Sequence, residues 1–314
     1  MSPVTPAAAA TGTLSAIVQD KYGAAPEELL RPAETARPAI ADDGILVHIR
    51  AASVDRGTSH LMAGLAYPMR LAGFGLRKPI ATNPGRSMAG TVESAGTNMT
   101  QFQPGDDVYG TCDGSFAPYA RARAARIAPR PANLSFEQAA AVPVSALTAL
   151  QAVRRGKVQA GQKVLIIGAS GGVGTFAGQI AKSNGAEVTG VCSPAKTDLV
   201  RATGADHVID YNAEELRRRQ ATLRRHLDIG GCDRLAHLCR ALKPHGRLVL
   251  VGGEDGGRWP GGMDRHRTYL LSQTPRPSAT SRKAAPASRS SSSFEDCPPP
   301  DHTRRRLTSF GSGT

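Results

Sequence analysis

The stretch Val164-Leu165-Ile166-Ile167-Gly168-Ala169-Ser170-Gly171-Gly172-Val173-Gly174 decides the fold of this 314-residue chain. Four apolar residues predict a short buried strand, the glycines predict a tight turn, and a helix is expected over residues 175–183. In such a turn the first glycine permits the bend, the second lets backbone N–H groups approach a pyrophosphate, and the third lets the helix pack on the sheet. The helix N-terminus adds free N–H groups and a positive dipole end. The stretch therefore predicts a dinucleotide site. A glycine-rich turn that binds no ligand is the alternative.

Strands and helices alternate after this turn. We expect strands at 187–191, 207–209 and 247–251 and a helix at 196–203. This alternation is typical of an α/β fold with a doubly wound parallel sheet. We assign residues 146–269 to such a Rossmann domain, incomplete at its C-terminal end.

The preceding residues, 14–145, predict a second, β-rich domain. Short apolar or β-branched runs at 14–19, 44–54, 88–95 and 107–109 are separated by turn signals such as Asn83-Pro84-Gly85. Ser135 and Gln138 have the spacing of a capping box, which marks a helix start. The Ala-rich run 139–153 continues that helix, with Pro143 as an interruption.

Composition excludes several classes of protein. Hydrophobic residues make up 40% of the chain, enough for a core, and aromatic residues only 4%, which argues against a nucleic-acid binder that stacks bases. No apolar run approaches the roughly 18 residues of a membrane span, and the Ala/Pro-rich residues 1–13, read as flexible, do not resemble a secretory signal. The 5 cysteines are odd in number and widely spaced, which favours a reduced, cytoplasmic protein.

The net charge of +13 is concentrated in two short segments. Residues 216–226 contribute +5 and residues 270–314 contribute +4, so the rest of the chain is only mildly basic. Residues 270–314 hold ten Ser and six Pro and no apolar periodicity, which predicts a disordered basic tail. Nucleic acid is therefore not the partner that we expect.

The end of the second strand indicates which nucleotide binds. NAD-binding proteins usually carry Asp or Glu about 20 residues after the glycine turn, to hold the ribose hydroxyls. This chain has Val191-Cys192-Ser193-Pro194-Ala195-Lys196, with no acid at that point. A hydroxyl followed by a cation suits the 2′-phosphate of NADPH. A solvated first-turn lysine is the alternative for Lys196.

Together these segments resemble the zinc-independent quinone oxidoreductases of the medium-chain dehydrogenase/reductase superfamily, of the NADPH:quinone reductase or zeta-crystallin type. The resemblance runs almost continuously from about residue 14 to about residue 265, with a gap near 216–226. The segments that carry it are 16–23, 45–55, 84–90, 104–108, 114–117, 140–151 and the specific run Gly204-Ala205-Asp206-His207-Val208-Ile209-Asp210-Tyr211.

The resemblance implies a GroES-like catalytic domain, a Rossmann domain and NADPH in the cleft between them. It implies hydride transfer to quinones or other α,β-unsaturated carbonyls, and a homodimer. The residues that it places at the cofactor are Thr148, Gly168, Ser170, Gly171, Gly172, Val173, Gly174, Ser193, Lys196, Tyr211, Val251, Gly252 and Gly253. Of these, Ser193, Lys196 and Tyr211 would hold the 2′-phosphate. Tyr67 stands where the family often has a substrate-pocket tyrosine.

Zinc is the alternative within the superfamily. Where a zinc alcohol dehydrogenase has Cys and a Gly-His-Glu motif, this chain has Asp55 and Gly85-Arg86-Ser87. One nearby histidine, His60, cannot make a site alone, and we interpret it as a cleft or core residue. We therefore expect no metal. Asp55 stands where the family often has Asn. It is either a catalytic residue, a donor only when protonated, or a simple turn residue.

Two departures from the family pattern are large. An apolar strand is expected before Asp228, yet the chain has Arg-rich residues 216–226, and a buried parallel strand should not accept so many charges. After residue 272 the family's last strand is missing, which should leave the edge of 247–251 unpaired. GC-rich codons read out of frame would produce both compositions. We therefore hypothesise a frameshifted or truncated C-terminus, with an evolved basic tail as the alternative.

Two functions of different class follow. The first is an NADPH-dependent quinone or enone reductase. The second is a catalytically inactive nucleotide-binding remnant, or a basic RNA-interacting protein on the same fold. Cofactor binding without turnover would favour the second.

Overall fold

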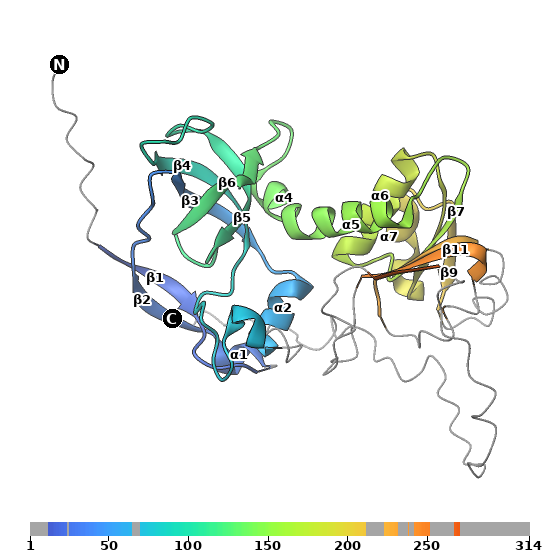
Figure 1. Cartoon of the computed structure of the whole chain (residues 1–314), viewed down its shortest axis with the longest axis horizontal. Coiled ribbons are helices and arrows are strands. Elements are labelled where there is room, and N and C mark those ends of the chain that lie inside the picture. Colours follow the sequence, from blue (N-terminus) through green and yellow to red (C-terminus); the bar gives the residue numbers. More distant parts are fainter. Residues whose placement is uncertain are drawn as a thin grey trace, which may run out of the picture.

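A computed structural model of the chain describes residues 12–23, 25–64, 70–211, 223–231, 238, 242–251 and 267–270. The described residues form a closed β-barrel and a six-stranded sheet, which are joined by helices α4 (Phe136–Ala140) and α5 (Pro143–Gly156) (Figure 1). This is the two-part α/β architecture that the sequence predicts. The expected domain boundary at residue 145 lies inside α5.

The barrel consists of four antiparallel strands. These are β3 (Gly44–Ser53), β4 (Ser87–Ala95), β5 (Asp107–Asp113) and β6 (Tyr119–Pro129). Alternate side chains fill its interior, among them Ile45, Val47, Met88, Val92 and Val108. A slip of one residue would turn this apolar set outwards, so burial fixes the register. The three strands expected in this region are confirmed.

Smaller elements lie beside the barrel. Strands β1 (Thr13–Val18) and β2 (Arg31–Ala36) pair antiparallel, with helix α1 (Pro26–Leu29) between them. Helix α2 (Arg56–Ala63) follows β3, and a π-helical turn, η1 (Arg70–Phe74), comes next. The Gln19 N–H donates to Thr82 O at 2.8 Å, which ties the end of β1 to the loop before β4.

The capping box before α4 is confirmed. The Ser135 side chain accepts from the Gln138 N–H, and the Gln138 side chain accepts from the Ser135 N–H. Pro143 ends the first helix and stands in the first turn of α5, where its missing N–H costs nothing.

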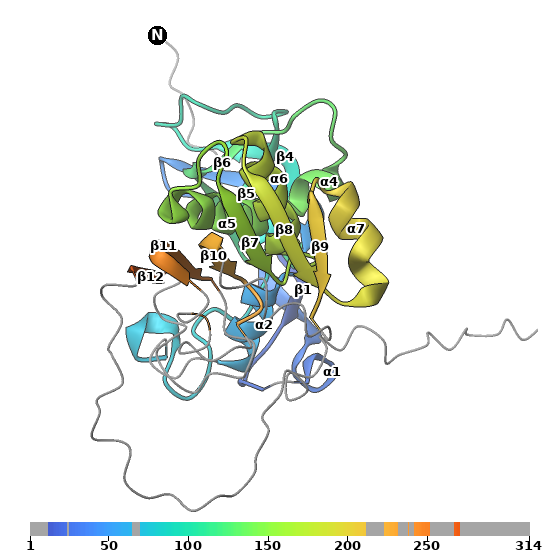
Figure 2. The ribbon, with the colours of Figure 1, turned by 90° about the vertical axis from the view of Figure 1, so that its right-hand side faces the viewer.

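The sheet has the strand order β12-β11-β10-β7-β8-β9. Its strands are β7 (Lys163–Ile167), β8 (Glu187–Cys192), β9 (His207–Asp210), β10 (Leu223–Asp228), β11 (Leu242–Leu250) and β12 (Arg267–Leu270). All neighbours are parallel except β11 and β12 (Figure 2). The order reverses between β7 and β10, and ligands of such sheets bind where the strands on either side of that point end.

The core occupies both faces of the sheet. On one face, Val164, Ile166 and Leu227 pack with residues of α5, α6 (Gly172–Ser183) and α7 (Thr197–Ala202). On the other, Leu165 and Leu248 belong to a second cluster. Two-sided burial explains why β7 reads as a continuous apolar run.

The expectation that the Arg-rich stretch forms no buried parallel strand is wrong for residues 223–226, and residues 216–222 lie outside the described residues. Strand β10 begins at Leu223 and lies between β7 and β11. Its His226 is 0% exposed, and burial lowers the pKa of that imidazole to about 4, so the ring is neutral at pH 7. His226 therefore adds no buried charge to the strand, and the Arg225 side chain beside it is only half-buried.

The expectation of an unpaired edge beyond residue 247 is also wrong. Strand β12 pairs antiparallel with β11, from Arg247 opposite Leu270 to Leu250 opposite Arg267. The predicted tail, 270–314, lies outside the described residues apart from Leu270, as do residues 1–11 of the predicted flexible N-terminus.

Candidate functional site

The glycine turn lies at the reversal of strand order, between β7 and α6. Gly168 has φ +80°, and a Cβ there would lie 2.9 Å from the Gly230 nitrogen at the end of β10. A Cβ on Gly174 would lie 2.1 Å from Gly168 O. Both positions therefore accept only glycine, the first for its backbone conformation and the second for its close packing.

The middle of the turn is open instead. Gly171 is the N-cap of α6 and, like Gly172, is exposed, and no side chain caps the helix. A Cβ on Gly171 would meet only Gly168 O, at 3.6 Å. The turn thus offers uncapped N–H groups at the start of a 12-residue helix, which suits a pyrophosphate. Ser170 and Val173, beside these glycines, are half-buried.

The end of β8 holds the residues expected at the 2′-phosphate. Ser193 is half-buried and Lys196 is exposed at the end of a 3-10 turn, where its N–H donates to Ser193 O at 3.0 Å. The Lys196 side chain has no ion-pair partner among the described residues. It is therefore available to an anion.

The structure adds two charged residues that the sequence analysis did not assign to the site. Burial raises the pKa of the Cys192 thiol, and the Asp210 carboxylate raises it further, whereas a hydrogen bond to Thr197 and the Arg201 charge lower it. Arg201 and Asp210 therefore both lie near the end of β8. The register of β9, which places Asp210 opposite Cys192, brings the acid there. The spacing of an acid along the chain cannot reveal this neighbour on another strand.

Three further cofactor candidates lie on elements around the turn. Thr148 is half-buried on α5, one turn after Ser145, whose Oγ would lie 3.0 Å from a Cβ on Gly172. Tyr211 and Val251 follow β9 and β11 and pack on the two core clusters. Gly252, Gly253 and the substrate-pocket candidate Tyr67 lie outside the described residues.

Asp55 has a local structural role. It is the N-cap of α2, and its Oδ1 accepts from the Thr58 N–H at 2.9 Å. Its Oδ2 is buried and has no hydrogen-bond partner in the described part of the chain. The geometry agrees with the turn-residue interpretation and also leaves one oxygen uncommitted. His60, in the last turn of α2, is half-buried.

Metal-ligand geometry is absent from the described part of the chain. There, no group of three or more His, Cys, Asp and Glu side chains could hold a metal ion. Ser87 is buried at the start of β4, where zinc enzymes would have a carboxylate. Burial raises the pKa of the nearby Cys112 thiol to about 12, so this thiol is protonated at pH 7.

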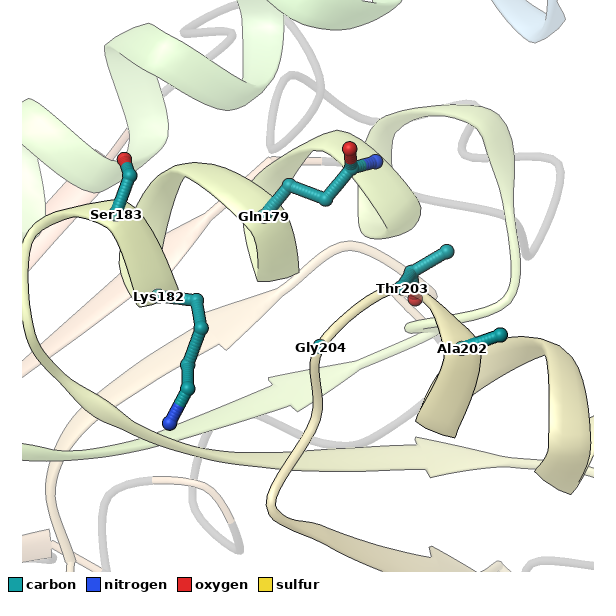
Figure 3. A pocket seen from close by; sticks show the side chains of 6 residues that line it. All are labelled: Gln179, Lys182, Ser183, Ala202, Thr203 and Gly204. Atoms are coloured by element: carbon teal, nitrogen blue, oxygen red, sulfur yellow. The ribbon is translucent and has the colours of Figure 1, made fainter.

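A cavity of about 410 Å³ lies at the C-terminal ends of α6 and α7 (Figure 3). Its lining residues are Gln179, Lys182, Ser183, Ala202, Thr203 and Gly204. It sits at the opposite end of α6 from the glycine turn, and Lys182 is paired with Asp206 at 2.5 Å. We therefore do not assign it to the cofactor.

No helix among the described residues is long and apolar enough to cross a membrane.

Two family models match the chain. "Alcohol dehydrogenase GroES-like domain" matches residues 41–132, which include the barrel, and "Zinc-binding dehydrogenase" matches residues 172–272, which include most of the sheet. The second match ends at residue 272, a few residues beyond the end of the resemblance at about residue 265.

Known relatives agree with these matches. The chain is 33% identical over 227 residues to the mitochondrial NAD(P)H oxidoreductase RTN4IP1 of Mus musculus, covering 66% of this chain and 56% of that protein. It is 34% identical over 212 residues to a chloroplastic quinone-oxidoreductase homolog of Spinacia oleracea, covering 64% and 62%. The chain thus spans a little over half the length of these relatives.

Among solved structures, the chain is similar to the quinone oxidoreductase of Escherichia coli complexed with NADPH. The TM-score is 0.66 with 26% identity, covering 77% of this chain and 74% of the other.

Proposed function

Because the chain belongs to the quinone oxidoreductase-like branch of the medium-chain dehydrogenases/reductases, we propose that it uses NADPH to reduce quinones or other α,β-unsaturated carbonyls without zinc. The observation that carries the proposal is the glycine turn at the reversal of strand order. Its exposed, uncapped N–H groups lie where a parallel sheet binds a dinucleotide.

The residues around the turn fit the cofactor. The backbone N–H groups at Gly171 and Gly172 would bind the pyrophosphate, because both residues are exposed at the uncapped start of α6. Ser193 and Lys196, with Tyr211 nearby, would hold the 2′-phosphate. Thr148 and Val251 would border the nicotinamide ribose. Bound NADPH supplies a hydride for the carbonyl acceptor.

Without a metal, this chain's residues must orient the acceptor and exclude water. Asp55 holds the start of α2 through the Thr58 N–H. Its second oxygen is acceptor-only when ionised, so it would donate to a carbonyl only when protonated. We therefore assign it to the catalytic cleft in a positioning role, alongside the candidate Tyr67.

Turnover tests the proposal directly. We expect the purified chain to oxidise NADPH in the presence of a soluble benzoquinone or a simple enone. The loss of NADPH absorbance measures this reaction. NADPH binding with no turnover of either acceptor would contradict the proposed reaction and favour the inactive remnant. The cytoplasmic location and the homodimer stay predictions.

Replacing Lys196 by alanine should weaken NADPH binding by about 1.5–3 kcal/mol, the scale of a hydrogen bond to a charged group. NADH binding should be nearly unchanged, because NADH lacks the 2′-phosphate. A calorimetric titration with both cofactors measures the difference. Lys163→Ala is the matched control, since this exposed lysine lies at the other end of the sheet, beside Glu187. Equal losses for both cofactors would contradict the assignment.

The purified protein should contain no stoichiometric zinc, and a chelator should not change its affinity for NADPH. Elemental analysis and a titration in the presence of chelator measure the two quantities, with a zinc alcohol dehydrogenase treated in parallel as the control. About one zinc per chain would show that a metal site exists.

A further inference from the structure

Tyr22 bonds to a part of the chain far from it in sequence. Its hydroxyl lies 2.7 Å from Phe74 O and 2.8 Å from Gly75 O, at the end of η1. Burial raises the pKa of Tyr22, with the Arg70 charge opposing, so the hydroxyl keeps the proton that these carbonyls accept. One side chain from the loop after β1 thus holds the backbone 52 residues away.

Arg70 completes the contact from the other side. Its guanidinium lies 4.3 Å from the centre of the Tyr22 ring, a cation–π geometry. Its Nε donates to Gly64 O at 2.9 Å and its Nη2 to Ala63 O at 3.4 Å. The positive charge thereby satisfies carbonyls at the C-terminal end of α2, where the helix dipole favours a cation.

The packing at this point is tight. Gly64 has φ +65°, and a Cβ there would lie 2.6 Å from the Tyr22 ring and 2.7 Å from the Arg70 Nη2. Tyr22, Gly64 and Arg70 therefore form one unit, which we call the Tyr22 clamp. It joins the loop after β1, the end of α2 and the start of η1.

The segment that the clamp holds, residues 70–80, has little apolar anchorage of its own. Leu71, Leu76 and Ile80 are 76%, 61% and 71% exposed. The segment closes on itself through the Ile80 N–H, which donates to Phe74 O at 3.0 Å. Exposed apolar side chains contribute little hydrophobic stabilisation. The position of the 70–80 segment relative to α2 therefore depends on the polar contacts of the clamp.

The segment also lies close in sequence to a residue of the proposed active site. It follows α2, whose N-cap is Asp55, and leads to the turn Gly85-Arg86-Ser87. In Figure 1 η1 (cyan) lies near α2, below the barrel. A displacement of this segment would therefore move the boundary of the acceptor site while leaving the glycine turn, on the other domain, untouched.

We propose that Tyr22 and Arg70 are positioning residues for carbonyl-acceptor binding, acting through the 70–80 segment. This inference rests on the proposed reductase function. The clamp should affect the binding of the acceptor and not the binding of NADPH, because the proposed NADPH-binding residues belong to the domain of the parallel sheet.

The test is Tyr22→Phe, which keeps the ring and the cation–π contact and removes the one O–H donor that Phe74 O and Gly75 O share. We expect the KM for the benzoquinone to rise about 3- to 10-fold, on the scale of one net hydrogen bond. The kcat and the Kd for NADPH should stay within twofold. Amide hydrogen exchange in peptides covering 70–80 should accelerate. Arg70→Gln, which removes the charge at the end of α2, should act in the same direction.

Tyr119→Phe is the matched control. Tyr119 also lies under an arginine, with Arg37 at 4.4 Å from its ring, and stacks on His48, but its hydroxyl has no hydrogen-bond partner among the described residues. This variant should leave every quantity unchanged.

The outcomes separate the two proposals. An active wild-type protein whose KM is unchanged in Tyr22→Phe and Arg70→Gln overturns the positioning role and leaves the reductase function standing. Equal effects on acceptor and NADPH binding indicate general destabilisation and also overturn it. A wild-type chain that binds NADPH and reduces no acceptor overturns both.

Discussion

His226→Leu is expected to raise the free energy of unfolding by about 2–3 kcal/mol at pH 7. His226 is 0% exposed, and neither ring nitrogen has a hydrogen-bond partner among the residues that the structure describes. A buried polar atom without a partner costs about 1–3 kcal/mol. The residues opposite it, Leu165 on β7 and Leu248 on β11, are apolar and fully buried, so leucine suits the site. Urea unfolding measures the change.

The gain should grow as the pH falls. Burial lowers the pKa of His226 from 6.5 to about 4 in the folded chain. Between these two pH values the unfolded chain binds a proton that the folded chain does not. The free energy of unfolding therefore decreases as the pH is lowered from 6.5 to 4. The loss is about 1.4 kcal/mol per pH unit and about 3 kcal/mol over the window. The leucine variant should lack this component of the acid sensitivity.

His207→Gln is the control for the pH profile. His207 is an exposed histidine whose ring bonds to Glu187 at 2.9 Å. Its replacement should change stability little at pH 7 and leave the loss between pH 6.5 and 4 in place. If the free energy of unfolding of wild-type and of His226→Leu changes equally with pH throughout this window, His226 is not buried in neutral form.

Gly174→Ala and Gly171→Ala should separate folding from cofactor binding. A Cβ at position 174 would lie 2.1 Å from Gly168 O, a backbone atom that cannot move without opening the turn. We expect a loss of about 3 kcal/mol in stability, at the upper end of overpacking effects. Thermal unfolding without ligand measures it.

Gly171→Ala should leave the free protein intact, because its Cβ meets only Gly168 O at 3.6 Å. The methyl group projects where the pyrophosphate would approach, so NADPH affinity should fall at least tenfold. A Gly171→Ala protein with wild-type affinity for NADPH would show that the turn binds no phosphate. A Gly174→Ala protein of wild-type stability would show that the helix does not pack as described.

Most strands and helices before residue 211 could be predicted because their signals are local, whereas β2, β6, α1 and α2 were not predicted. A four-residue apolar run bounded by glycine indicates β7, and the spacing of Ser135 and Gln138 indicates the start of α4. Gly168 and Gly174 could be assigned because backbone conformation and close packing leave no other residue type. For the candidate site, the sequence identified residues that follow each strand but not their neighbours on other strands, such as Asp210.

What the sequence by itself determined is therefore the two-part fold, the glycine turn and the strands and helices with strong local signals. The tertiary structure decided that β10 includes His226, that β12 covers the edge of β11, and that Tyr22 reaches Phe74. Each of these depends on residues distant in sequence. In β10 the fully buried side chain next to the arginines is the neutral His226, while Arg225 is only half-buried, and a sheet edge is unpaired only until another segment reaches it. Such partners are set by packing in three dimensions, which local periodicity does not encode.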